Sequence, residues 1–152
     1  MTAFLLSIVL IAATILIHYE TLRVGSRAYR ILGFRPRMRL WLMLGTAMIS
    51  HLLHIALYAG AFVLLEFVFE VGAIDGPDSG TCNDAFYFSI TSYTTLGIGD
   101  IYPSGQVRFL SGIEALNGLV MVTWTASLTY LYMERFWNIG EDSKNQNEDS
   151  ML

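Results

Sequence analysis

The sequence predicts an all-α membrane protein with three transmembrane helices, a short re-entrant helix and a glycine-containing loop. Hydrophobic residues make up 54% of the 152 residues, charged residues only 14%, and the mean hydropathy is +0.50. Soluble domains carry about 25% charged residues. Three long apolar segments lie within residues 3–19, 40–69 and 106–137, and a helix of about 20 apolar residues crosses the hydrocarbon of a bilayer. The composition therefore disfavours a soluble enzyme.

The first apolar segment, residues 3–19, is expected to be a retained transmembrane helix. No basic residue precedes it and arginines follow it, which is the reverse of the charge order in a cleaved signal peptide. His18 and Tyr19 are expected at the end of this helix, where amphipathic rings favour the membrane interface.

Residues 20–39 contain six of the nine basic residues of the chain. Positive charge marks cytoplasmic loops, so residues 1–39 are expected to comprise an N-terminal transmembrane helix and an Arg-rich cytoplasmic loop, with the N-terminus outside. Arg23, Arg27 and Arg30 share one face if this region is helical, and such a face attracts anionic lipid. A topology signal with no lipid site is the alternative.

The second apolar segment, residues 40–69, carries His51 and His54 near its middle. Ionisable groups at that depth are candidates for function. A metal site needs three or four ligands, and the sequence offers no obvious further ones. Interhelical hydrogen bonding by neutral imidazoles is therefore expected, and a metal transporter that depends on both histidines is the remote alternative.

A short helix is expected over residues 84–94, too short to span the bilayer and therefore re-entrant. The segment that follows, residues 94–100, reads TTLGIGD. Glycine at alternate positions lets the backbone adopt positive φ, so successive carbonyls can turn to one side. A row of carbonyls can replace the hydration shell of a cation. An inner helix is expected over residues 106–137, followed by a disordered cytoplasmic tail over residues 138–152, because that tail is polar.

This order of parts resembles the pore module of tetrameric potassium channels of the small prokaryotic type, with an extra N-terminal helix. The resemblance covers residues 40–137. The usual filter pattern of that family is TTVGYGD, and Leu96 and Ile98 depart from it. The matching positions are Thr94, Thr95, Gly97, Gly99 and Asp100.

The resemblance implies a homotetramer in which each chain supplies one filter strand. The implied ion-binding residues are Thr95, Leu96, Gly97, Ile98 and Gly99, with K⁺ on the carbonyls of the first four. The implied filter-supporting residues are Thr94, Asp100, Tyr87, Phe88, Ser92 and Glu114.

Several roles within that supporting set follow from the resemblance. Tyr87 is expected to donate a hydrogen bond to Asp100. Ile98 cannot make the polar tie of the usual tyrosine, so it is expected to pack on Phe88. Glu114 is expected to brace the back of the short helix. Gly118 is a possible hinge of the inner helix, and close packing against the short helix explains it equally well.

The predicted function is a potassium-selective channel that passes K⁺ passively across the plasma membrane. A non-selective monovalent cation channel is one alternative, because of Ile98, and a non-conducting membrane adaptor with the same fold is another. No catalytic constellation is visible, so an enzyme is not expected. No nucleic-acid partner and no cofactor are expected, with K⁺ as the permeant ion. The single cysteine, Cys82, cannot form an intrachain disulfide.

Overall fold

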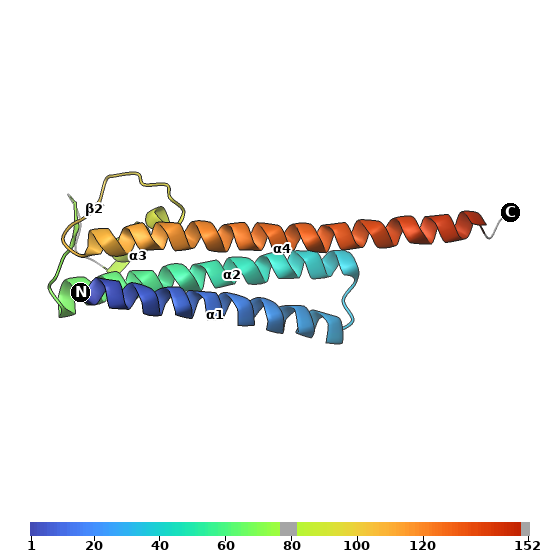
Figure 1. The fold of residues 1–152 in the computed structure, drawn as a ribbon, viewed down its shortest axis with the longest axis horizontal. Coiled ribbons are helices and arrows are strands. Elements are labelled where there is room, and N and C mark those ends of the chain that lie inside the picture. The colour runs from blue at the N-terminus through green and yellow to red at the C-terminus, as the bar shows by residue number, and fades with distance from the viewer. Residues whose placement is uncertain (77–81, 150–152) are drawn as a thin grey trace.

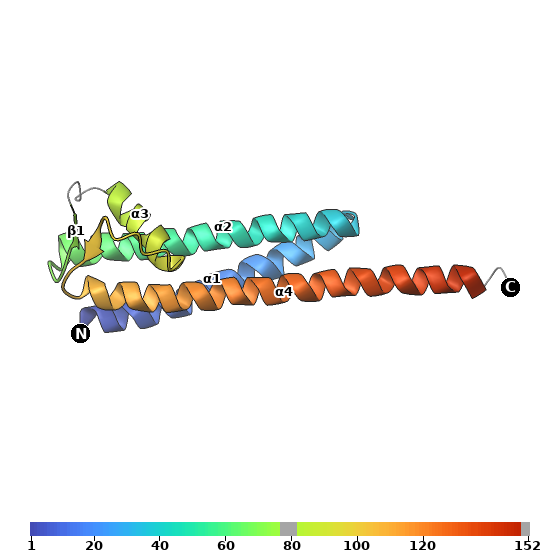
Figure 2. The same ribbon diagram turned by 90° about the horizontal axis from the view of Figure 1, so that it is seen from above.

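Three long helices lie side by side in the computed structural model, which describes residues 1–76 and 82–149 (Figure 1). The view at right angles shows the short helix α3 at one end of this bundle, beside α2 and α4 (Figure 2). The elements in chain order are α1 (Thr2–Ile31), α2 (Pro36–Val63), the π-helix η1 (Leu64–Val68), β1 (Ile74–Asp75), α3 (Cys82–Tyr93), β2 (Tyr102–Pro103) and α4 (Val107–Asp149).

The predicted all-α membrane fold is confirmed by the length and hydropathy of the helices. Among the described residues, three helical stretches are long and apolar enough to cross a membrane: Thr2–Ile31, Arg37–Val68 and Val107–Glu134. The short helix α3 has 12 residues, which is too few to span the bilayer.

Helix α1 is longer than the sequence predicts. It continues through the arginines to Ile31, and the turn to α2 is confined to residues 32–35, so most of the expected Arg-rich loop is helical. Gly25 does not interrupt the helix, because its missing side chain admits close packing: an added Cβ would lie 3.2 Å from Thr46 Cγ2. The first proline after the start of the chain is Pro36, which stands in the first turn of α2, where proline is favoured.

One stripe of α1 is buried against the other two long helices. Its residues recur at intervals of three or four, as one face of a helix does, and most are small or polar, which lets membrane helices approach closely. They are Ala3, Ser7, Leu10, Thr14, His18, Leu22 and Gly25. Helix α1 is therefore packed into the fold along its length.

A two-stranded sheet joins the segment that precedes α3 to the segment that follows the loop after α3. Strands β1 and β2 are antiparallel, with Ile74 opposite Pro103. The Gln106 amide donates to the Val71 carbonyl at 2.9 Å. Gly105 is required here, because its φ is +55° and an added Cβ would lie 2.5 Å from Val71 O. The exit of the TTLGIGD segment is thereby held to the loop that precedes α3.

Helix α4 extends beyond the predicted inner helix. It begins at Val107 and continues to Asp149, so the expected end at residue 137 is wrong, and so is the expected disorder of residues 138–149. These residues contain no proline, and an existing helix adds residues without a new nucleation cost. Residues 150–152 of the predicted tail lie outside the described residues.

Candidate functional site

The filter segment, defined here as residues 94–100, follows directly from the end of α3 at Tyr93. Positive φ values occur at alternate residues: 58° at Thr95, 54° at Gly97 and 86° at Gly99. Glycine adopts such angles without steric cost, whereas Thr95 is strained by about 1–3 kcal/mol. Alternating φ values of this kind allow successive peptide carbonyls to turn toward the same side of a segment.

The amides of the filter segment face the last turns of α3. Leu96 N and Gly97 N donate to the Thr91 carbonyl at 2.9 and 3.2 Å, and Thr95 N donates to the Ser92 carbonyl at 2.9 Å. Carbonyls at the C-terminus of a helix lack partners within the helix, so the filter segment satisfies them. These amide hydrogen bonds hold the first residues of the filter segment against the C-terminal end of α3.

Tyr87 and Asp100 make the hydrogen bond that was expected. The Tyr87 hydroxyl donates to Asp100 Oδ2 at 2.9 Å, and the Ile101 amide donates to the other carboxylate oxygen at 3.0 Å. The hydrogen bond to Asp100 raises the pKa of Tyr87 above its ordinary value. The hydroxyl therefore keeps its proton, and the bond, at neutral pH.

The expected packing of Ile98 on Phe88 is not made within the chain. Phe88 lies on the face of α3 that meets α2, and its ring packs on Phe62 with centroids 5.1 Å apart. Ile98 is 58% exposed. Ser92, one of the implied filter-supporting residues, donates to the Ser111 carbonyl at 2.9 Å, and it therefore ties α3 to α4. Helix orientation, which the motif does not encode, decides these contacts.

Glu114 lies behind α3, where it was expected. Its Oε1 forms a short hydrogen bond with Ser89 Oγ, which also lies 2.8 Å from the Ile55 carbonyl. Ser89 has one hydroxyl hydrogen, and the Ile55 carbonyl accepts only. Both contacts are satisfied when Ser89 donates to Ile55 and a protonated Glu114 donates to Ser89. This chain of contacts joins α4, α3 and α2.

Gly118 is explained by close packing. A Cβ at this position would lie 2.2 Å from the Tyr93 carbonyl oxygen, and α4 is an uninterrupted helix through this residue. Of the two explanations that the sequence left open, packing against α3 is the one with a structural observation behind it.

All three histidines of the chain gather in one buried cluster. The ring of His18, from α1, lies 5.2 Å from that of His51 and 5.5 Å from that of His54. The expectation that His18 lies at the membrane interface is wrong: it is fully buried, because α1 continues well past it. Among the described residues, this is the group of side chains spaced closely enough to hold a metal ion.

Three hydroxyls bridge the histidines in a closed ring of six contacts. The Tyr93 hydroxyl lies 2.9 Å from His51 Nδ1 and 3.1 Å from His54 Nδ1. Thr125 Oγ1 lies 3.0 Å from His51 Nε2 and 3.1 Å from His18 Nε2. Ser50 Oγ lies 3.1 Å from His18 Nδ1 and 3.4 Å from His54 Nε2. Every imidazole nitrogen thus has a hydroxyl partner.

The number of hydrogens in this ring fits neutral imidazoles. Three neutral imidazoles and three hydroxyls supply six hydrogens for the six contacts of the ring, and the Thr125 hydroxyl, which also lies 3.1 Å from the Met121 carbonyl, directs its one hydrogen either to a histidine or to that carbonyl. The interhelical hydrogen bonding expected of His51 and His54 is therefore present. The sequence did not indicate the contribution of His18, Tyr93 or Thr125. The absence of a helix-breaking residue after Tyr19 was the signal that would have placed His18 inside a longer helix.

A second polar link joins α1 to the rest of the bundle. Asn117 Nδ2 donates to Thr14 Oγ1 at 2.8 Å and to the Tyr58 hydroxyl at 3.2 Å. Asn117 and Thr14 are buried. This amide therefore connects α4, α1 and α2 through one side chain.

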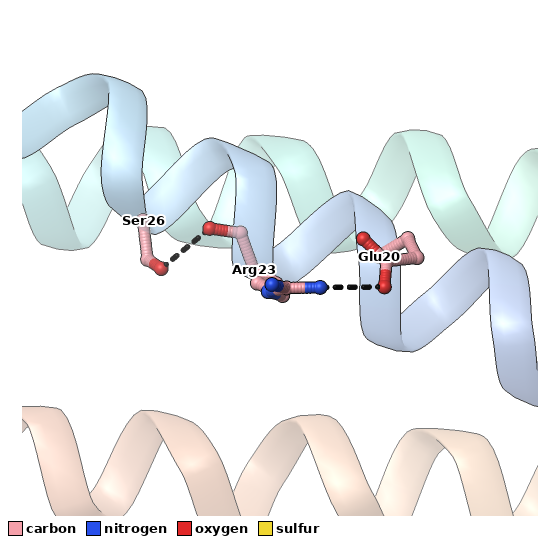
Figure 3. A network of polar contacts seen from close by, with 3 residues as sticks. All are labelled: Glu20, Arg23 and Ser26. Carbon is pink, nitrogen blue, oxygen red and sulfur yellow. Dashed lines mark hydrogen bonds and ion pairs between the residues drawn. The ribbon is translucent and has the colours of Figure 1, made fainter.

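The arginines of α1 lie on its solvent-exposed part. Figure 3 shows Arg23 between Glu20 and Ser26: Arg23 Nη1 lies 3.0 Å from Glu20 Oε1, and Ser26 Oγ donates to the Arg23 carbonyl at 2.9 Å. The charged side chains are 58% and 52% exposed, and ion pairs so exposed contribute little to stability. Glu20 nevertheless offsets part of the positive charge of Arg23.

The fold and the filter segment together define a membrane-embedded ion channel pore module. The family model described as "Ion channel" matches residues 39–135, more than half of the chain. The chain therefore belongs to this ion channel family, whose two-transmembrane pore module is of the potassium-channel kind. Helix α1 precedes the matched residues. Comparisons with curated proteins and with solved structures gave no match.

Proposed function

We propose that the protein is a potassium-selective channel that passes K⁺ passively down its electrochemical gradient. The observation that carries this proposal is the alternation of positive φ at Thr95, Gly97 and Gly99, in a chain of the ion channel family. Carbonyls on one side of such a segment can replace the water around a dehydrated cation.

The proposed K⁺ ligands are the carbonyls of Thr95, Leu96, Gly97 and Ile98, with Gly99 providing the turn that ends the row. The number and direction of these carbonyls depend on the backbone and not on the side chain at position 98. The change from the usual tyrosine to Ile98 therefore preserves the coordinating groups and removes only a polar tie.

One chain supplies one filter strand, so we propose a homotetramer. Leu96 is 65% exposed and Ile98 is 58% exposed in the single chain. Three further copies around the pore axis would cover them. Leu119 and Val122, which are also exposed on α4, would then face the central cavity or a neighbouring copy.

The proposed location is the plasma membrane, with the N-terminus outside. Thr2 Oγ1 donates to Gln106 Oε1 at 2.9 Å, so the N-terminus lies at the same end of the bundle as the filter exit (Figure 1). The turn at residues 32–35 and the arginines lie at the opposite end. Positive charge favours the cytoplasmic side, which orients the filter outward and the C-terminus inward.

Anionic lipid is the proposed partner of the arginine face of α1. A groove beside Arg23 is lined mainly by apolar and aromatic side chains, among them Tyr19, Leu22 and Met43. A headgroup phosphate paired with Arg23, Arg27 or Arg30 would place acyl chains along this groove. Because the membrane surface attracts basic side chains by about 1 kcal/mol each, replacing all three arginines by glutamine should weaken co-purification of anionic lipid.

A flux measurement in liposomes tests the proposed selectivity. Wild-type protein is expected to pass K⁺ strongly and Na⁺ weakly, and Gly97→Ala is expected to abolish K⁺ flux, because alanine resists φ of +54°. Gly60→Ala is the matched control: its Cβ would meet nothing within 4 Å, so flux should persist.

Each alternative function predicts a different outcome of this measurement. A reversal potential near zero with K⁺ on one side and Na⁺ on the other would establish the non-selective channel, the alternative that rests on the replacement of the usual tyrosine by Ile98. No flux from correctly folded wild-type protein, with Gly97→Ala changing nothing, would establish the non-conducting adaptor.

A further inference from the structure

We propose that His18, His51 and His54 form a binding site for a divalent transition metal of the Zn²⁺ type. The site would lie inside the bundle and join α1 to the pore module. This inference is independent of potassium selectivity, because it concerns a cluster that takes no part in the filter.

The donor set is the first support for this site. The chain has three histidines, and all three lie together although α1 and α2 contribute them from distant positions. Their ligand atoms lie within 4.8 Å of one another. Imidazole nitrogen suits Zn²⁺, Cu²⁺ and Ni²⁺, whereas Mg²⁺ and Ca²⁺ take oxygen ligands.

The spacing of the three rings agrees with tetrahedral coordination. Zn–N distances of about 2.0–2.1 Å in a tetrahedral site place the centroids of the ligating rings roughly 5 Å apart. The observed centroid separations are 5.2, 5.5 and 6.0 Å. The ligand nitrogens, now within 4.8 Å of one another, need to approach by up to about 1.5 Å to reach a bound zinc, which rotations of the side chains would supply.

Tyr93 is placed to give the fourth ligand. Its hydroxyl oxygen lies 2.9 Å from His51 Nδ1 and 3.1 Å from His54 Nδ1, close to the roughly 3.3 Å between neighbouring ligand atoms of a tetrahedral zinc. Loss of the phenol proton on binding would leave one negative ligand beside three neutral ones. It would thereby halve the charge that the apolar surroundings must accommodate.

The remaining ring nitrogens already have the partners that metal ligands use. Metal-bound histidines donate their other N–H to an oxygen that fixes the orientation of the ring. With the two Nδ1 atoms bound, His51 Nε2 would donate to Thr125 Oγ1, now at 3.0 Å. His54 Nε2 would donate to Ser50 Oγ, now at 3.4 Å. Either nitrogen of His18 has one of these two hydroxyls as partner.

The experiment measures metal binding by the full chain. The protein is purified in detergent with a histidine-free tag and in a Cys82→Ser background, which removes the one thiol of the chain. Zn²⁺ alone, and then Co²⁺ alone, is titrated and the metal content is determined. We expect one ion per chain and the intense visible absorption of tetrahedral Co²⁺. His18→Gln should weaken Zn²⁺ binding by more than the roughly 10–100-fold that loss of an orienting partner causes, since it removes one of the ligands.

Thr125→Val leaves all the proposed ligands in place, so it tests the site without removing a donor to the metal. It should weaken Zn²⁺ binding by about 10–100-fold, as loss of an orienting partner does. Thr123→Val is its control, because Thr123 Oγ1 donates only to the Leu119 carbonyl of its own helix at 2.8 Å.

Two outcomes overturn the proposal. One is folded wild-type protein that binds no more Zn²⁺ than a variant with all three histidines replaced by glutamine. The other is a Co²⁺ spectrum typical of octahedral coordination. Neither outcome depends on ion flux, so failure of the metal site and failure of the proposed channel function are separate results.

Discussion

Gly118 shows how much the position of α3 depends on a single missing side chain. The Tyr93 carbonyl occupies the space that a Cβ at position 118 would need. Tyr93 is also the last residue before the filter segment and a member of the histidine cluster. Whatever displaces this carbonyl therefore acts on both sites at once.

Gly118→Ala is predicted to destabilise the protein by about 1–3 kcal/mol, as overpacking of a core does. The physical reason is the 2.2 Å approach of the new Cβ to Tyr93 O. Thermal unfolding of purified protein checks the prediction. Gly112→Ala is the control on the same helix: nothing lies within 4 Å of its Cβ, so it should be neutral or stabilising. Equal effects of the two substitutions would contradict this explanation.

The Tyr87–Asp100 bond predicts a pH dependence with a definite sign. The pKa of Tyr87 is raised in the folded chain by its hydrogen bond to Asp100, while in the unfolded chain it is about 10. Its contribution to stability is therefore complete below about pH 10 and is lost as the pH rises through the raised pKa.

Tyr87→Phe removes this contribution. We expect the variant to be less thermally stable than the wild type by a constant amount from neutral pH to about pH 9, and the difference to shrink above about pH 10. Melting temperatures across this range supply the measurement. A difference that shrinks toward low pH would show that another group is responsible.

At the scale of elements, α1 is fastened to the pore module by polar contacts along its length, from Thr2–Gln106 at one end to Tyr29–Thr46 at the other, with two buried links between them. The Thr14–Asn117–Tyr58 link lies toward the filter end, and the histidine cluster lies deeper. Removing a single link should therefore weaken the docking of α1 without releasing it.

A double-mutant cycle on Thr14→Val and Asn117→Leu is predicted to show a coupling energy. Interhelical hydrogen bonds in membranes average about 0.6 kcal/mol, with a maximum near 1.7, and the 2.8 Å bond should fall in this range. Reversible unfolding of the four proteins provides the energies. A parallel cycle that pairs Thr14→Val with Thr123→Val should give none, since Thr123 bonds within its own helix.

The positive φ angles at Gly97 and Gly99 could be predicted from the sequence, because glycine favours them locally. Three features can be read directly from the sequence: the glycines at 97 and 99, the acid at 100, and a helix too short to span the membrane. The Tyr87–Asp100 contact followed from the resemblance, and it is present. Ile98 and Phe88 were paired incorrectly, because that pairing depends on which face of α3 meets α2.

Helix ends and interhelical contacts were harder to predict. Hydropathy marks where the membrane ends and not where a helix ends, so α1 and α4 were both predicted to end earlier than they do. The expected end of α1 placed His18 at the interface and hid the cluster. Contacts between residues as distant as His18 and Thr125 depend on the rotation of each helix about its axis, which a single sequence does not reveal.

At the scale of the whole molecule, the proposed assembly makes a direct prediction. Native mass spectrometry of detergent-solubilised protein should give four times the 17.0 kDa chain mass. Gly97→Ala should leave that mass unchanged, because it alters the filter backbone and removes no exposed apolar side chain. A stable monomer or dimer that still conducts K⁺ would contradict the four-fold filter.

The closed ring around the histidines has a direction. Each hydroxyl accepts from one imidazole and donates to the next, so the six hydrogens can all point clockwise or all point anticlockwise. Both orders satisfy every ring nitrogen and carry no net charge. The two orders differ only in the positions of protons, and the heavy atoms are the same in both.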